Sequence, residues 1–256
     1  MTILIAGGDS FTYGNELSDC TSNRASINTW SSLLADKLGM SYDCTAWGGD
    51  GNSAIARKTM TACSKHLAQG HDITVAVMWS FPGRYEFRFA YNTKERHSPW
   101  YTITPWTHET NTNIVIEAFK NFSDNMFSHY ENNRSTAEQT GIAKFSKTYY
   151  DHVGSDEYWS TYNYVKEIVL LQDWLKLRDI PYIFTFVDNI VFEKQDLDSI
   201  LKALYDSLDY SRLLPDLGFY SWAHQEKFPF GATHPLEPAH SAFVNKILAF
   251  ATQKLK

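Results

Sequence analysis

The feature that most constrains the fold is a short apolar run that stops at two glycines near the start of the chain. Residues 2–6 are apolar or β-branched, and Gly7 and Gly8 follow directly, before Asp9 and Ser10. A continuous run of this kind is typical of a strand buried on both faces of a parallel sheet. Ligands of open α/β sheets bind just beyond the carboxyl ends of the strands. The pattern therefore predicts Ser10 at a ligand-binding edge, although the same residues also suit an ordinary turn with an Asx or Ser cap.

Strands and helices alternate through the first third of the chain. Asn28 or Thr29 is expected to cap the first helix, and Gly39 is expected to close it. The expected elements are helices at residues 30–38 and 52–69 and strands at residues 40–47 and 73–79. Such alternation favours right-handed crossovers. We therefore predict an α/β fold, a three-layer flavodoxin-like parallel sheet of about five strands with helices on both faces.

The regular pattern breaks after residue 79 and resumes near residue 160. Residues 82–157 are rich in aromatics and poorly periodic, and we interpret them as an insertion with short helices of its own, for instance at residues 113–129. The insertion suits either a sugar-binding wall or a small secondary core, and we favour the core. After it we expect helices at residues 160–177, 196–208 and 237–255 and strands at residues 181–187 and 219–222. No repeat or linker divides the chain, so a single domain over residues 1–256 is expected.

Composition narrows the classes of function. The 256 residues are 43% hydrophobic and carry a net charge of −6 without a basic run, so nucleic-acid binding is not expected. Three cysteines without CxxC spacing indicate reduced thiols, and no signal peptide or membrane span is evident, so a cytoplasmic location is expected. No metal-binding histidine motif and no G-x-G-x-x-G turn is present, so we expect neither a metal nor another cofactor.

Three short motifs lie on loops at the predicted ligand-binding edge. The first is Gly8-Asp-Ser-Phe-Thr-Tyr-Gly14, the second is Gly51-Asn52-Ser53, and the third is His234-Pro235 with His240. In this order they resemble the sequence blocks of the SGNH/GDSL hydrolase superfamily. The resemblance covers both ends of the chain but not the insertion. It implies that Ser10 is the nucleophile, that His234 is the base and that Gly51 supplies a backbone oxyanion donor.

The chemistry of acyl transfer needs these residue types. A serine hydroxyl is a poor nucleophile until a base takes its proton, and an imidazole titrates in the right range to accept and return it. Negative charge then develops on the former carbonyl oxygen, where the N–H groups of Ser10 and Gly51 would stabilise it. The non-catalytic interpretation of His234 is a structural cap ahead of the last helix. We favour catalysis.

The chain departs from the family pattern in two places. The asparagine that usually follows the third strand is absent, so Ser80 or Arg84 would replace it as an oxyanion donor, or the hole has only two donors. Arg84 would alternatively bind an anionic group of the substrate. Asp9 is grouped with these residues as a substrate-binding candidate. Gly231 stands where the family usually has the acid that orients the histidine, so we expect a Ser–His dyad or a carboxylate from elsewhere, Asp188 or Glu226.

Two classes of function follow. The first is a serine esterase or deacetylase acting on an acyl ester of a small molecule or carbohydrate, with an acyltransferase using the same serine as a variant. The second is a binding protein of the same fold with impaired catalysis. Ser10, Gly51 and His234 favour the enzyme, and the absent asparagine and aspartate favour the binding protein.

Overall fold

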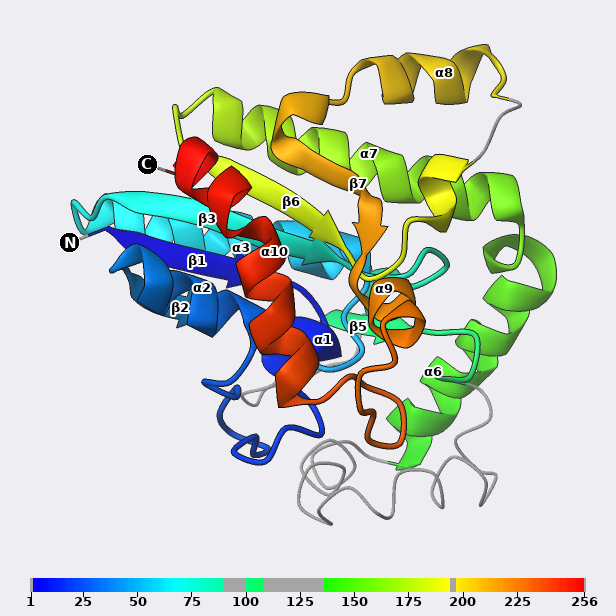
Figure 1. The fold of residues 1–256 in the computed structure, drawn as a ribbon. Coiled ribbons are helices and arrows are strands. Elements are labelled where there is room, and N and C mark those ends of the chain that lie inside the picture. Colours follow the sequence, from blue (N-terminus) through cyan, green and yellow to red (C-terminus); the bar gives the residue numbers. More distant parts are fainter. Residues whose placement is uncertain (1, 90–99, 108–135, 194–196, 256) are drawn as a thin grey trace.

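A parallel sheet of five strands forms the centre of the computed structural model, which describes residues 2–89, 100–107, 136–193 and 197–255. The strand order is β2-β1-β3-β6-β7, and every neighbouring pair is parallel (Figure 1). The strands are β1 (Ile3–Gly7), β2 (Ser41–Cys44), β3 (Ile73–Trp79), β6 (Tyr182–Phe186) and β7 (Leu213–Gly218). The predicted α/β class is confirmed.

Helices cover both faces of the sheet and create two cores. One face carries α2 (Trp30–Leu38) and α10 (Glu237–Leu255), and the other carries α3 (Asn52–Ala68), α7 (Glu157–Lys176) and α8 (Ser199–Asp206). Side chains along β3 alternate between the two cores, because successive residues of a strand point to opposite faces. Val75 and Val77 pack with α3 and α7, whereas Ala76 and Met78 pack with α2 and α10.

Local signals in the sequence set the ends of these helices. The Thr29 hydroxyl accepts the Ser32 N–H and caps α2, and Gly39 ends that helix in the left-handed region at φ 68°. The predicted apolar stripe of α7 is buried, and α10 has the predicted bounds. Across the described ranges, no helix combines the length and the apolar character needed to span a bilayer.

The last strand lies earlier in the chain than the sequence predicts. Residues 219–222 form the first half of a helix, α9 (Phe219–Gln225), and the fifth strand is β7, which ends at Gly218. Phe219 and Ala223 are buried four residues apart, which is the spacing of a helix face. Pro215 argues against a strand in the sequence, because proline cannot donate a backbone hydrogen bond. It is tolerated in β7 because this strand lies at the edge of the sheet. Short 3₁₀ turns lie at Ile190–Glu193 and Tyr210–Arg212.

The described part of the insertion contains a helix, as expected, and an antiparallel strand pair that the sequence did not predict. Strands β4 (Tyr85–Arg88) and β5 (Trp100–Ile103) form an antiparallel pair, and α6 (Thr136–Tyr149) continues into a π-helical turn at Tyr150–Gly154. Four buried side chains form a small core of their own: Tyr85, Ile103, Ile142 and Tyr150. The helix expected at residues 113–129 lies outside the described residues. The hairpin approaches α3 beside the sheet edge that carries Ser10.

Candidate active site

Ser10 begins a one-turn helix directly after the first strand. The chain leaves β1 at Gly7, where a β-carbon would lie only 2.4 Å from Thr59 Oγ1, and enters α1 (Ser10–Tyr13). Asp9 caps this helix, because its Oδ1 accepts the Phe11 N–H at 3.1 Å. The turn is therefore both an Asx cap and a platform for Ser10. The Ser10 side chain lies at the carboxyl end of β1, where ligands of α/β sheets bind.

His234 lies within hydrogen-bonding distance of Ser10, although 224 positions separate them in the chain. The Ser10 Oγ and His234 Nε2 atoms are 2.7 Å apart. The Phe11 ring packs against the imidazole with the ring centroids 4.6 Å apart, and only 9% of His234 is exposed. The loop is tight at this point, since the Gly231 N–H donates to the His234 carbonyl. The imidazole is therefore held with Nε2 facing the Ser10 hydroxyl, at a distance that permits proton transfer.

Glu16 completes the arrangement on the other side of the imidazole. His234 Nδ1 donates to Glu16 Oε1 at 2.5 Å, and the Thr233 N–H and hydroxyl also donate to this carboxylate. Burial opposes ionisation of Glu16, but the hydrogen bonds from His234 and Thr233 outweigh it and leave its pKa lowered. An ionised Glu16 fixes the tautomer in which Nδ1 carries the proton and Nε2 faces Ser10.

Gly231 and Glu16 belong to different loops, and the Glu16 carboxylate occupies the space that a side chain at Gly231 would fill. A β-carbon at Gly231 would lie 2.0 Å from Glu16 Oε2, so any larger residue there would displace the carboxylate. Glu16 itself has φ 73°, a left-handed conformation that is unusual for a non-glycine residue. Such outliers cluster at functional sites, where the surrounding structure holds them. Gly231 therefore leaves room beside His234 for an acidic side chain from another loop.

The structure corrects the expectation that Asp188 or Glu226 orients His234. Asp188 accepts hydrogen bonds from the Ser221 hydroxyl and the Ile190 N–H, both at 2.8 Å. Glu226 is exposed at the end of α9. Sequence reasoning missed Glu16 because it considered only Asp188, after a predicted strand, and Glu226, ahead of the histidine. The signal that was available is an acidic residue six positions after Ser10, combined with Gly231 at the usual acid position.

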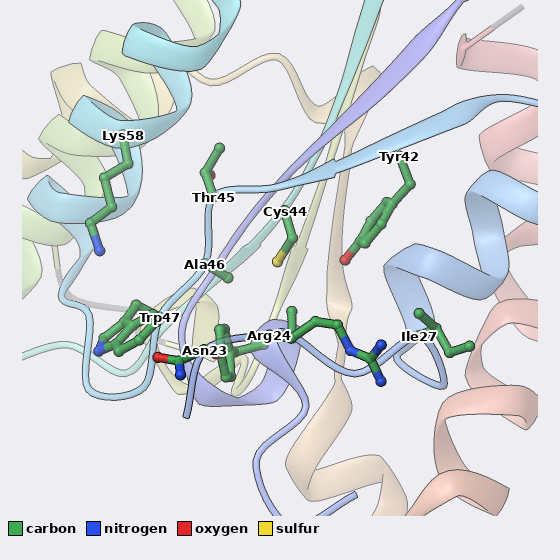
Figure 2. Close-up of a pocket in the computed structure, with 11 residues that line it drawn as sticks. Asn23, Arg24, Ile27, Tyr42, Cys44, Thr45, Ala46, Trp47 and Lys58 are labelled. Atoms are coloured by element: carbon green, nitrogen blue, oxygen red, sulfur yellow. The ribbon is translucent and has the colours of Figure 1, made fainter. Parts of the chain in front are cut away.

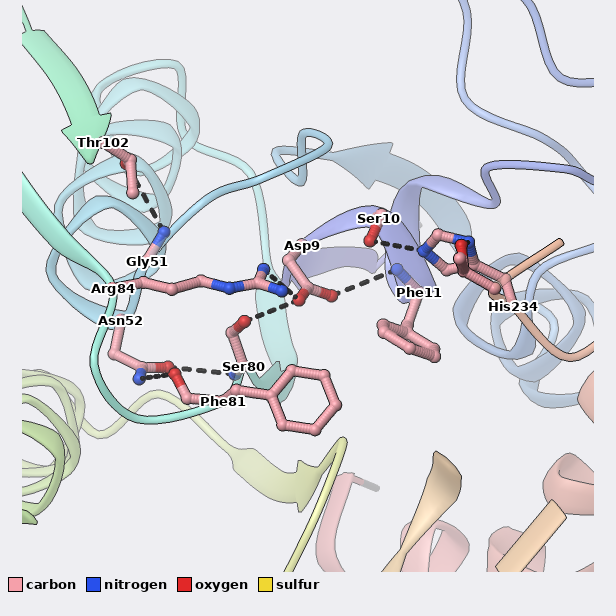
Figure 3. A network of polar contacts seen from close by, with 11 residues as sticks. Asp9, Ser10, Phe11, Gly51, Asn52, Ser80, Phe81, Arg84, Thr102 and His234 are labelled. Atoms are coloured by element: carbon pink, nitrogen blue, oxygen red, sulfur yellow. Dashed lines mark hydrogen bonds and ion pairs between the residues drawn. The ribbon is translucent and has the colours of Figure 1, made fainter. Parts of the chain in front are cut away.

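Asp9 joins Ser80 and Arg84 in a buried network next to Ser10. Asp9 Oδ2 accepts the Ser80 hydroxyl at 2.6 Å and Arg84 Nη1 at 3.0 Å, and the Asp9 side chain is fully buried. Figure 3 shows Arg84 reaching toward Asp9 from the side of Gly51, while Ser10 Oγ is directed at His234. The structure thus brings two of the sequence candidates, Ser80 and Arg84, into contact with the third, Asp9.

Gly51 and Asn52 connect this network to α3 and to the insertion. The Gly51 N–H donates to Thr102 Oγ1 in β5 at 3.4 Å, which is longer than a typical hydrogen bond. A β-carbon at Gly51 would lie 2.7 Å from the Arg84 carbonyl oxygen, so this position needs glycine. Asn52 accepts the Ser80 N–H and donates to the Phe81 carbonyl, which ties α3 to the loop after β3. Sequence reasoning quoted Asn52 in a motif but gave it no role.

A pocket of about 460 Å³ opens beside α1, along the carboxyl end of β2. Figure 2 shows Tyr42 and Cys44 pointing from β2 toward the loop that carries Arg24. Its lining combines aromatic and polar side chains, among them Tyr13, Asn23, Arg24, Tyr42, Trp47 and Lys58. Tyr13 belongs to the same helical turn as Ser10, and its ring packs against Trp47 with the centroids 4.9 Å apart. Neither Ser10 nor His234 lines the pocket.

His240, the second histidine of the last motif, has a structural contact. Its Nδ1 accepts the N–H of Trp30, the first residue of α2, at 3.1 Å. The side chain is 1% exposed, and burial, together with the nearby His234, lowers the pKa of His240 to about 3. His240 is therefore neutral at neutral pH and satisfies one of the free N–H groups at the start of α2.

This low pKa predicts a loss of stability in acid. Below the unfolded-state pKa of 6.5, the unfolded chain binds a proton at His240 that the folded chain refuses until pH about 3. The free energy of unfolding should therefore fall by up to about 1.4 kcal/mol per pH unit across this window because of this residue. Denaturant titrations from pH 7 to pH 4 should show a shallower decline for His240→Asn. The exposed control His152→Asn should keep the wild-type slope, and equal slopes in all three proteins would contradict the assignment.

No protein-family model and no curated protein matches the sequence. Similar solved structures include a member of the lipolytic protein G-D-S-L family from Veillonella parvula, with 12% identity and a TM-score of 0.45 over 99% of this chain and all of the other. An acetyl xylan esterase from Butyrivibrio proteoclasticus has 11% identity and a TM-score of 0.42, over 98% of this chain and 63% of its own.

A third similar structure is a carbohydrate esterase whose active site displays divergent catalytic and non-catalytic binding functions. It has 13% identity and a TM-score of 0.42, over 99% of this chain and 65% of its own. The chain therefore spans less than two thirds of the length of both carbohydrate esterases. At this level of similarity, the roles of Ser10, His234 and Glu16 depend on their own contacts.

Proposed function

We propose that the chain is a serine esterase or deacetylase that hydrolyses an acyl ester of a small molecule or carbohydrate. The observation that carries the proposal is the continuous relay from Ser10 Oγ through His234 to Glu16, with hydrogen bonds of 2.7 and 2.5 Å. Nucleophile, base and orienting acid in this geometry are the parts of a serine hydrolase triad. A binding protein with impaired catalysis has no need of an ionised carboxylate on the far side of the histidine.

The first half of the reaction acylates Ser10. His234 Nε2 takes the hydroxyl proton as Ser10 Oγ forms a bond to the ester carbonyl carbon. The carbonyl oxygen becomes an oxyanion in the tetrahedral intermediate. The ester C–O bond then breaks, the carbonyl re-forms, and His234 gives the proton to the leaving alkoxide. Glu16 stabilises the transient imidazolium without taking the proton.

The second half of the reaction releases the acid. Water enters where the alcohol has left, and His234 Nε2 takes one of its protons as its oxygen attacks the acyl carbon. The bond between Ser10 Oγ and the acyl carbon then breaks, and the proton returns to Ser10. A second alcohol in place of water would give acyl transfer by the same steps.

Two backbone N–H groups are available to the oxyanion in this proposal. Ser10 is the first residue of α1, so its N–H lies outside the hydrogen-bond ladder of the helix. Among the described residues, the Gly51 N–H is engaged only by the long contact to Thr102, which substrate would have to displace. Backbone donors that already point at the reacting oxygen stabilise its charge without reorganisation.

The pocket beside α1 is not lined by Ser10 or His234, so in this proposal it would hold only a part of the substrate remote from the ester. A volume of about 460 Å³ lies within the range of small-molecule sites. Aromatic rings such as Trp47 offer flat apolar surfaces to sugar rings, and Asn23 and Arg24 offer hydrogen-bond donors. The similar solved structures include esterases that act on carbohydrates, which agrees with this substrate class.

Hydrolysis assays with different classes of substrate test the proposal, because they show which bond the protein cleaves. Purified protein should hydrolyse an aryl acetate and release acetate from an acetylated xylo-oligosaccharide, but should leave an aryl phosphate and a peptide anilide intact. Adding an alcohol in excess tests the acyltransferase variant, because a new ester would then accumulate. An absence of ester cleavage above the blank would contradict the enzyme and favour the binding protein.

A further inference from the structure

The structure distinguishes between the candidates for the missing side-chain oxyanion donor. The Ser80 hydroxyl donates to Asp9 Oδ2, and the Ser80 N–H donates to Asn52 Oδ1. Ser80 is 1% exposed, and a hydroxyl has only one proton to donate. Both donors of Ser80 are therefore already used inside the protein.

Arg84 differs from Ser80 because it keeps an unused donor. Its Nη1 donates to Asp9 Oδ2, and its side chain is only 9% exposed. The Nε atom is fully enclosed and has no hydrogen-bond partner within the described part of the chain. A buried donor without a partner is destabilising, and the enclosed Nε is out of reach of a substrate, so the terminal nitrogens are the ones available to it. The terminal nitrogens of the guanidinium group carry four N–H groups, and the bond to Asp9 uses one of them, so the others remain for a substrate oxygen.

The surroundings of Arg84 hold its guanidinium group in place. The rings of Phe81 and Trp106 each lie 5.5 Å from Arg84 Cζ, and the ion pair with Asp9 fixes the end of the side chain. Asp9 precedes Ser10 in the chain, so the cation is anchored one residue from the nucleophile. Donors held before the reaction are the ones that stabilise developing charge most effectively.

We infer that Arg84 is the side-chain oxyanion donor of this site, in place of the absent asparagine, with Ser80 and Asp9 as its positioning residues. The inference deepens the proposed esterase function and depends on it. As Ser10 Oγ bonds to the carbonyl carbon, the oxyanion accepts a hydrogen bond from the guanidinium group and releases it when the carbonyl re-forms. The Gly51 N–H is partly engaged by Thr102. The hydrogen bond from Arg84 therefore contributes more to stabilising the oxyanion than the one from Gly51.

The charge balance favours this role over recognition of an anionic substrate. Asp9 neutralises Arg84, and the neighbouring cations are also paired, Arg57 with Glu86 and Lys58 with Asp50. The site therefore offers a permanent anion little net attraction. A neutral ester needs only directed N–H groups while charge forms in the transition state, and the guanidinium group retains these.

The test compares Arg84→Met with Arg57→Met, a matched loss of an arginine that pairs with Glu86 in the insertion. With a neutral aryl acetate, Arg84→Met should lower kcat by about 10²–10³-fold and leave KM within about threefold. Affinity for a boronic acid that forms a tetrahedral adduct should fall in parallel with kcat/KM. Arg57→Met should retain wild-type kcat within about threefold.

Arg84→Met leaves the Asp9 carboxylate buried without its cation, so Asp9→Asn/Arg84→Met provides a second variant if the first fails to fold. Asparagine keeps the cap on α1, and the same loss of kcat is expected. If the wild type is active and both Arg84 variants retain its kcat, the inference fails while the esterase proposal stands. A raised KM confined to an anionic succinate monoester would also overturn it, in favour of anion recognition. An inactive wild type would instead contradict the esterase proposal.

Discussion

Glu16→Gln is expected to lower kcat for an aryl acetate by about 10⁴-fold, with little change in KM. The glutamine amide has nearly the same shape as the carboxylate, so the loop should keep its conformation. It lacks the negative charge that stabilises the imidazolium, and its NH₂ group would favour the tautomer with the proton on Nε2. That tautomer cannot accept the Ser10 proton. Steady-state kinetics over a range of pH measure the effect.

Controls for this prediction come from the two acids that the structure rules out. Asp188→Asn and Glu226→Gln should each keep kcat within about threefold, because both lie elsewhere in the fold. The space shared by Glu16 and Gly231 allows a rescue as well. In a Glu16→Ala/Gly231→Asp variant, the acid returns to the histidine loop, and kcat should recover about tenfold or more over Glu16→Ala. A large loss in Asp188→Asn together with an active Glu16→Gln would overturn the assignment.

Ser10→Ala should lower kcat by about 10⁴–10⁶-fold, since the reaction loses the group that forms the acyl-enzyme. The change should leave the fold intact, because the Asp9 cap and the Phe11 contacts do not use the Ser10 hydroxyl. Thermal unfolding followed by circular dichroism checks this point. The surface variant Ser64→Ala on α3 serves as the control and should keep wild-type kinetics.

The losses of activity caused by removing Ser10 and His234 should not multiply. Ser10→Ala/His234→Ala should lose little more activity than Ser10→Ala alone, because the histidine acts only through the serine. Losses that multiply in the double variant would mean that His234 contributes by another route, and the relay from Ser10 to Glu16 would then be the wrong description of the site.

The sequence was sufficient to predict the layers of the fold. Buried parallel strands are short and continuously apolar, and helices carry a stripe and end at residues such as Gly39, so local patterns identified most elements. The prediction was wrong at residues 219–222 because an aromatic run suits a strand and a buried helix equally well. Pro215 concealed the true edge strand. Within the insertion, β4 and β5 pair across a long separation that no local pattern reveals.

Some residues of the candidate site could be predicted from the sequence, and others could not. Ser10 and His234 were proposed because each lies in a short motif, Ser10 directly after the first strand and His234 ahead of the last helix. Glu16 was not predicted, because its contact with His234 joins two loops 218 positions apart. Gly231 was read as a loss, and only the structure shows that its missing side chain makes room for Glu16. Ser80 and Arg84 were indistinguishable in sequence and differ in the structure by which donors are already used.

The most direct measurement of the central claim is covalent labelling of the chain with a fluorophosphonate, followed by peptide mass spectrometry. The account predicts one adduct per chain, on the peptide that carries Ser10, with labelling abolished in Ser10→Ala and strongly slowed in His234→Ala and Glu16→Gln. An adduct on another residue of an active preparation, or an active preparation that takes up no label, would contradict it.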